Sequence, residues 1–165
     1  MRYFYIDSCS LVKRYHKEKG TDQVDVLFDK LIGRKPNCLI TSIISIPETI
    51  ATLNRKKNEG KIETTQFKEI LANLFEEVDM LDTITVDDER ILGSISLITK
   101  HNLNSADALH LSAIKEAGEI AKHIEGTVIM VTSDKRLLKV LETEGFKTVN
   151  PEEVDLITIK GLIEV

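Results

Sequence analysis

Short apolar runs alternate with longer segments of helical periodicity along the whole chain. Apolar runs of strand length lie at 3–6, 38–40, 81–86, 127–131 and 146–149. Apolar residues at the three- and four-residue spacing of helices occupy 8–15, 21–32, 45–57, 64–75, 88–98, 106–117 and 135–141. Alternating strands and helices are typical of a mostly parallel sheet. The pattern therefore predicts an α/β protein with helices on both faces of one sheet.

The last segment of the chain has no clear pattern. Glu152 and Glu153 favour the start of a helix, whereas Leu156–Ile159 has the composition of a strand. At 165 residues the chain has the length of one domain, and 42% of its residues are hydrophobic, which is enough for a sizeable core. We expect residues 1–150 to form this domain and residues 151–165 to be an extension packed on it.

Charge and cysteine content exclude some classes of function. The formal net charge of −5 argues against a protein that coats nucleic acid non-specifically, since such proteins are usually basic. No apolar run approaches the roughly 18 residues of a membrane helix, and the N-terminus lacks the features of a secretory signal. Cys9 and Cys38 are the two cysteines of the chain. So few thiols without an export signal favour a reducing cytosol, so we expect a cytoplasmic protein that does not bind membranes.

Four acids lie where predicted elements meet. Asp7 follows the first strand, and Ser8 next to it offers a cap for the following helix and a hydroxyl beside the acid. Asp134 follows a buried strand, and Glu48 and Asp107 lie at the predicted starts of two other helices. The carboxyl ends of strands are where open α/β sheets place their chemistry. We therefore predict that the four carboxylates converge on one site.

Carboxylates in a shielded site need a compensating cation. The helix around Asp107 carries apolar residues nearly all round, so this acid is expected to be screened from water. No Lys or Arg lies within one turn of it, and none adjoins Asp7. Oxygen ligands without a His or Cys cluster favour Mg²⁺ or Mn²⁺, which can activate water at a phosphodiester. Thr132, two residues before Asp134, is placed to hydrogen-bond one of the carboxylates.

Each acid also has a purely structural interpretation. Asp7 suits the N-cap of the following helix, and the stretch from Ser45 to Glu48 matches a capping box. Asp107 and Asp134 lie where helix dipoles favour acids. A carboxylate that caps a helix can also bind a metal ion, so both interpretations stay open.

Four stretches resemble the motifs of the PIN-domain nucleases, in particular the VapC-like toxins of toxin–antitoxin pairs. They are YIDSCSLVK at the N-terminus, SIISIPETIATLNR around Glu48, LNSADALHLSAI around Asp107 and VIMVTSDKRLLK around Asp134, in the family order. The resemblance implies a single-domain three-layer sandwich whose parallel sheet has five strands in the order 3-2-1-4-5. It also places Asp7 and Asp134 at neighbouring strand ends, where open sheets bind ligands.

The resemblance further implies a chemistry and a set of partners. Asp7 and Asp107 are implied as direct ligands of Mg²⁺ or Mn²⁺, and Glu48 and Asp134 as ligands that act directly or through water. Thr132 matches the hydroxyl position before the last acid. The implied activity is endonucleolytic hydrolysis of RNA by metal-activated water. We therefore expect an RNA substrate, a small antitoxin protein as partner, and a homodimer.

Basic residues provide a weak candidate surface for RNA. Lys13 and Arg14 end the helix after the first acid, Arg55 and Lys56 end the helix of the second, and all four are candidate phosphate contacts. The alternative is that they are solvated helix ends, where cations suit the dipole. His110, one turn after the third acid, is expected to be a packed helix residue.

A non-catalytic binding module that keeps the same fold, and acts through protein or RNA contacts, is the alternative function. The intact set of four acids argues against it. A phosphotransfer protein is disfavoured, because phosphatases that form an aspartyl-phosphate need a second acid two residues after the first, and Cys9 occupies that position.

Overall fold

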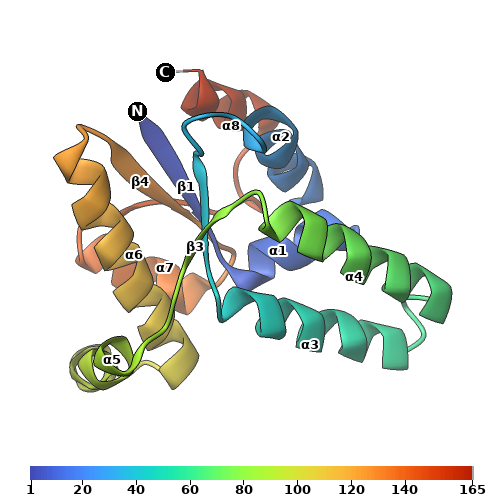
Figure 1. Cartoon of the computed structure of the whole chain (residues 1–165), viewed down its shortest axis with the longest axis horizontal. Coiled ribbons are helices and arrows are strands. Elements are labelled where there is room, and N and C mark those ends of the chain that lie inside the picture. Colours follow the sequence, from blue (N-terminus) through green and yellow to red (C-terminus); the bar gives the residue numbers. More distant parts are fainter. Residues whose placement is uncertain (165) are drawn as a thin grey trace.

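The fold is built on one five-stranded sheet, as the computed structural model shows for residues 1–164 (Figure 1). Its strands, all parallel, are β1 (Arg2–Ile6), β2 (Leu39–Ser42), β3 (Asp82–Ile84), β4 (Thr127–Val131) and β5 (Lys147–Val149). The strand order is 3-2-1-4-5, which confirms the predicted fold class and sheet order. The central strands β1 and β4 pair over their whole length, with Ile6 opposite Val131. Asp7 and Thr132, which follow these strands, therefore start at the same edge of the sheet.

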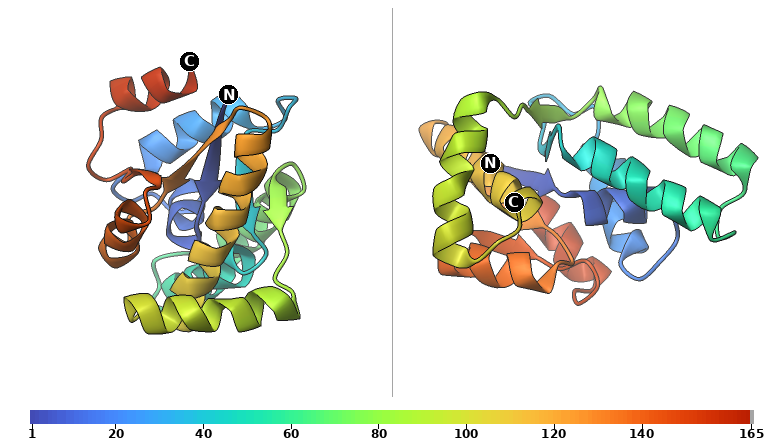
Figure 2. Two further views of the ribbon diagram at one scale, coloured as in Figure 1. Left: turned by 90° about the vertical axis from the view of Figure 1, so that its left-hand side faces the viewer. Right: turned by 90° about the horizontal axis from the view of Figure 1, so that it is seen from below.

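Helices cover both faces of this sheet (Figures 1 and 2). They are α1 (Ser8–Tyr15), α2 (Thr21–Leu31), α3 (Ser45–Asn58), α4 (Thr64–Val78), α5 (Asp88–His101), α6 (Ser105–His123), α7 (Lys135–Thr143) and α8 (Leu156–Ile163). Tyr5 of β1 packs with the buried faces of α6 and α7, whereas Phe4 packs with α1, α2 and α8 on the other side. Neighbouring residues of a strand point to opposite faces, so one short apolar run serves two cores.

Helices α3 and α4 form a pair that projects beyond the sheet (Figures 1 and 2). A separate apolar cluster joins this arm to α1, formed by Val12, Leu53, Ile62 and Ile70. Arg14 of α1 adds a polar link, because its guanidinium pairs with Glu77 of α4 at 2.7 Å and with Asp25 of α2 at 2.9 Å. The arm is thus fixed to the body through α1.

Several boundaries differ from the sequence prediction. Helix α6 continues past Ala117 to His123, because small and apolar positions persist at helical spacing through the buried Ala121. Strand β3 is shorter than 81–86, because its partner β2 ends at Ser42 and leaves nothing to pair with beyond Ile84. The ambiguous end of the chain forms the helix α8, capped by Asp155, and the strand interpretation of Leu156–Ile159 was wrong.

Two predicted caps were also wrong. The N-cap of α1 is Asp7, not Ser8, because the Asp7 carboxylate accepts the Ser10 N–H at 2.9 Å. Ser45 and Glu48 form no capping box, and α3 begins without a side-chain cap. Glu48 is therefore free to contact another element.

The two ends of the described chain lie close together (Figure 1). The Arg2 guanidinium donates to the carbonyls of Gly161 and Leu162, at 3.1 Å each. Ile159 of α8 is fully buried in the core that α8 shares with α1 and α2. Within residues 1–164, no helix has the length and apolar character needed to cross a membrane.

Candidate functional site

Asp7 is the most buried of the four acids, with 4% of its surface exposed. Its carboxylate accepts hydrogen bonds from the Ser10 N–H at 2.9 Å and from the Thr132 hydroxyl at 2.5 Å. The Cys9 thiol lies 3.1 Å from both Asp7 oxygens, and burial followed by the Asp7 charge raises the pKa of this thiol, so it stays a protonated donor. All these donors are neutral. Among the described residues no Lys, Arg or His pairs with Asp7, so its buried charge lacks a cationic partner.

Thr132 links Asp7 to Asp134. The Thr132 hydroxyl donates to Asp7, and its oxygen accepts the Asp134 N–H at 3.0 Å. Asp134 is exposed and caps α7, because its carboxylate accepts the N–H groups of Arg136 and Leu137 at 2.8 and 3.0 Å. Asp7 is an N-cap, as its structural interpretation predicted, and Asp134, predicted only to lie where the helix dipole favours an acid, also caps its helix. The caps also fix both acids at the same edge of the sheet.

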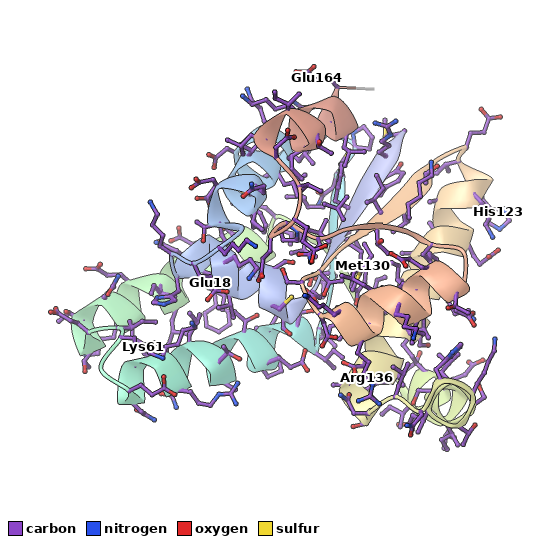
Figure 3. The ribbon with its side chains drawn as sticks, turned by 180° about the vertical axis from the view of Figure 1, so that it is seen from behind. Glu18, Lys61, His123, Met130, Arg136 and Glu164 are labelled. Carbon is purple, nitrogen blue, oxygen red and sulfur yellow. The ribbon has the colours of Figure 1, made fainter. Side chains whose placement is uncertain are left out.

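Asp107 lies half-buried in the first turn of α6. Asn104, the N-cap of this helix, accepts the Asp107 N–H at 2.8 Å and donates its amide to Asp107 Oδ2 at 2.9 Å. Burial and then the charge of Asp134 raise the pKa of Asp107 above its usual value, while His110 and Arg136 act in the opposite direction. Arg136 reaches from α7 to the turn between α5 and α6, where it donates to the Asn102 carbonyl (Figure 3). Burial and the nearby Asp134 thus disfavour the charged form of Asp107, which a cation bound beside it would favour.

Glu48 is held by a histidine that sequence reasoning did not assign to the site. His110 is 3% exposed; its Nε2 lies 2.8 Å from Glu48 Oε2, and its Nδ1 lies 3.1 Å from the Tyr5 hydroxyl. Burial acts to raise the pKa of Glu48, but the hydrogen bond from His110, the electrostatic interaction with His110 and then Ser8 outweigh burial and lower that pKa. One feature of the sequence could have pointed to this role. His110 lies three residues after Asp107, so both side chains share one face of the same helix. Its contact with Glu48 depends on the packing of α3 against α6.

The four acids occupy one region but are not drawn into a single cluster. Glu48 and Asp134 both shift the pKa of Asp107, and Asp7 and Glu48 both shift that of Tyr5. As placed, however, no three His, Cys, Asp or Glu side chains among residues 1–164 are close enough together to hold a metal ion. Carboxylate and hydroxyl oxygens suit Mg²⁺ or Mn²⁺, and excess negative charge favours a cation. The donor chemistry therefore fits such an ion, although these side chains would have to move to bind it.

Three of the four basic residues considered for RNA form ion pairs within the chain. Lys13 is 3% exposed and pairs with Glu18 at 2.9 Å and Glu152 at 2.7 Å. Lys56 also pairs with Glu18, and Arg14 holds the arm as described above. Arg55 is exposed at the end of α3. Contact with RNA stays a prediction for all four, and only Arg55 presents an exposed side chain without an acidic partner in the described structure.

Comparisons with known proteins agree with this fold. A family model described as the PIN domain matches residues 4–142. The fold is similar to PAE2754 from Pyrobaculum aerophilum, with 16% identity, a TM-score of 0.59 and coverage of 96% of both chains. It is also similar to a chain of a toxin–antitoxin complex from Klebsiella pneumoniae, with 14% identity, a TM-score of 0.54 and coverage of 91% of this chain and 98% of that one.

A third similar structure is FitAB bound to an IR36 DNA fragment, with 12% identity, a TM-score of 0.58 and coverage of 92% of this chain and 97% of that one. No curated protein matches the chain. At these identities the solved structures show a shared fold alone, whereas the family model spans most of the sequence. The chain therefore belongs to the PIN domain family.

Proposed function

We propose that this chain is a Mg²⁺- or Mn²⁺-dependent endoribonuclease and the toxin of a toxin–antitoxin pair. The observation that carries the proposal is the buried Asp7 carboxylate at the end of the central strand. It has only neutral hydrogen-bond donors, and it is joined through Thr132 to Asp134 at the end of the neighbouring strand. A buried charge of this kind is stable when a cation binds beside it.

In this proposal Asp7 and Asp107 hold the metal ion directly, and Glu48 and Asp134 complete the site directly or through water. The bound ion supplies an activated water and stabilises the charge that develops on the phosphodiester. The neighbouring side chains hold these carboxylates in place. Thr132 holds the Asp7 carboxylate, and the lone pairs not used in these hydrogen bonds stay available to a ligand.

Two other hydroxyl and amide groups would support the same acids. Ser8 acts with His110 to lower the pKa of Glu48, which keeps the Glu48 carboxylate ionised at neutral pH. The Asn104 amide holds Asp107 Oδ2. Neutral donors orient a carboxylate without cancelling its charge, which is what a metal site needs from the groups around its ligands.

RNA and an antitoxin are the proposed partners, in a cytosolic setting where both cysteines stay free thiols. Membership of the PIN family and the likeness to a toxin–antitoxin complex support the toxin role. The exposed Arg55 lies on the same helix as Glu48 and is the best placed of the four basic residues to meet an RNA phosphate.

A homodimer is proposed on the surface of α5. Ile91, Leu92 and Ile95 are 47%, 66% and 55% exposed, which forms an apolar stripe on this helix. Two copies of α5 in antiparallel contact would bury this stripe.

The decisive test is RNA cleavage by the purified protein with Mg²⁺ or Mn²⁺. We expect cleavage that EDTA abolishes, and a loss of about 100-fold or more in Asp7→Asn and Asp107→Asn, since each removes a charged ligand. Asp79→Asn, at an exposed acid remote from the sheet edge, should cleave like wild type. A wild-type protein that cleaves no RNA, and is no more toxic to cells than Asp7→Asn and Asp107→Asn, would refute the proposal.

A non-catalytic binding module is the second candidate. The observation that favours it is the separation of the acids, which form no ready metal cluster in the described chain. Isothermal titration distinguishes the two functions, because the nuclease must bind Mn²⁺ and the binding module need not. Absence of Mn²⁺ binding together with RNA or protein binding would favour this second function.

A further inference from the structure

A buried chain of hydrogen bonds runs from the sheet to the acidic edge. It connects the Tyr5 hydroxyl, the two nitrogens of His110 and the Glu48 carboxylate, over distances of 3.1 Å and 2.8 Å. The Tyr5 ring meets the His110 ring edge-on, at an interplanar angle of 89° and a centroid distance of 6.1 Å. Both rings are almost fully buried, so the imidazole has little freedom to rotate.

The direction of the contact with Glu48 follows from the chemistry of its partner. An ionised carboxylate only accepts hydrogen bonds, so the nitrogen that faces Glu48 Oε2 must carry a proton. That nitrogen is Nε2, and it donates to Glu48. The Tyr5 hydroxyl meets the other nitrogen, Nδ1, and so fixes the ring from the opposite side.

We propose that His110 is a positioning residue, which holds the Glu48 carboxylate at the acidic edge while Tyr5 fixes the orientation of its ring. A single imidazole N–H aimed at Oε2 suits this task, because its ring is held by Tyr5 and by burial and therefore directs the carboxylate. A carboxylate also has about four lone-pair sites, so one hydrogen bond leaves the others for a cation or water. The catalytic consequence rests on the proposed nuclease function.

The first test reads the hydrogen-bond chain without any reaction. Imidazole ¹⁵N spectra of the full-length protein should show His110 protonated at Nε2. Tyr5→Phe removes the hydroxyl but keeps the ring, and it should shift the Nδ1 resonance, because this nitrogen loses its hydrogen-bond partner. If Nε2 of His110 carries no proton in the wild type, or if the spectrum is unchanged in Tyr5→Phe, the inference is wrong whatever the protein does to RNA.

The second test separates positioning from packing. We expect His110→Leu to lower Mn²⁺ affinity and kcat by about 10- to 100-fold, with little change in the KM for RNA. His110→Gln, which keeps an N–H donor toward Glu48, should recover part of that loss. His123→Leu, at an exposed histidine of the same helix, serves as the matched control and should behave like wild type.

The thermal unfolding temperature of each variant shows whether a loss of Mn²⁺ binding or cleavage arises only because the variant is less stable. A folded His110→Leu that binds Mn²⁺ and cleaves RNA as well as wild type would overturn the positioning role. A wild-type protein that neither binds Mn²⁺ nor cleaves RNA would instead refute the proposed function. In that case the ¹⁵N spectra still decide whether His110 holds Glu48 through Nε2.

Discussion

The Thr132 hydroxyl donates a hydrogen bond of 2.5 Å to Asp7, a residue 125 positions away in the sequence. The oxygen of the same hydroxyl accepts the Asp134 N–H at 3.0 Å. One side chain at the end of β4 thus links the buried acid of β1 to the exposed acid that caps α7. The link exists because β1 and β4 pair in register up to their last residues, Ile6 and Val131.

Thr132→Val is expected to weaken the site while keeping the shape of the side chain. It leaves Asp7 without one donor and the Asp134 N–H without its acceptor, so we expect a loss of about 1–3 kcal/mol in the free energy of unfolding. Mn²⁺ affinity and the RNA cleavage rate should fall by about 10- to 100-fold. Thr132→Ser keeps the hydroxyl and is the control. Equal Mn²⁺ affinity in Thr132→Val and Thr132→Ser would contradict this account.

Asp107→Asn is expected to stabilise the metal-free protein at neutral pH. Burial and the Asp134 charge raise the pKa of Asp107 above its usual 3.8, so the folded protein binds this proton more tightly than the unfolded chain does. The contribution of Asp107 to stability is then fully present below pH 3.8 and is lost as the pH rises through the raised pKa. The gain in Asp107→Asn at pH 7 should be below about 1 kcal/mol, because Asp107 is only half-buried.

Urea unfolding at several pH values measures this difference. The advantage of Asp107→Asn over wild type should shrink as the pH falls toward 3.8. With saturating Mn²⁺ the order should reverse, since only the wild type gains stability from a bound ion. An Asp107→Asn protein that is less stable than wild type at pH 7 without metal would argue against the assigned cause.

Lys13→Ala tests whether this lysine is structural or meets RNA. Lys13 is buried between Glu18 and Glu152, and its removal would leave both carboxylates without their cation. These carboxylates are about one-third exposed, so we expect a loss of about 2 kcal/mol rather than the 3–5 kcal/mol typical of a fully buried pair. Lys17→Ala, at the exposed lysine nearby, should change stability by less than about 0.5 kcal/mol. If Lys13→Ala instead loses RNA affinity while its stability is unchanged, Lys13 contacts RNA.

Ile159→Ala tests whether α8 belongs to the same folded unit as the sheet. Ile159 is fully buried, while Ile157 on the same helix is 79% exposed. Truncating Ile159 should cost about 2–5 kcal/mol, because it leaves a cavity in the core shared with α1 and α2. Ile157→Ala should cost little. A single unfolding transition with an unchanged denaturant slope would show that α8 unfolds together with the domain.

Leu92→Glu is expected to prevent the proposed dimer. The substitution places a charge in the middle of the apolar stripe of α5, where the charge would be buried without a partner on association. Light scattering after gel filtration should then give the monomer mass for Leu92→Glu and the dimer mass for wild type. Ile157→Glu, at an exposed apolar residue of α8, is the matched control and should stay dimeric. A wild-type monomer at micromolar concentration would contradict the dimer.

Much of the fold follows from local sequence alone. Periodicity of two or of three to four residues placed the strands and helices, because it reports which face of a segment is apolar. It misplaced the ends of α6 and β3, because the end of a strand depends on its partner and the end of a helix on the core that it meets. Strand order came from the resemblance and not from periodicity, which carries no information on which strands are neighbours.

Some features of the candidate site also follow from the sequence, and others depend on the packing of the elements. The positions of Asp7 and Asp134 after apolar strands were sufficient to place both at one sheet edge, because all parallel strands end at the same side. The sequence also identified Thr132, since it lies two residues before Asp134. What it could not identify was the partner of Glu48, because Tyr5, Glu48 and His110 are brought together only when α3 and α6 pack beside β1.

Tertiary structure alone decided which polar groups are buried and which apolar faces are uncovered. Nothing in the helical pattern of the sequence marks Lys13 as buried or Leu92 as exposed. In the structure, however, the lysine is buried and the leucine is exposed. A helical pattern states which residues share a face, but burial depends on what the rest of the chain places against that face. The sequence by itself therefore determined the elements and the edge where the acids gather. The packing of those elements determined how each acid is held.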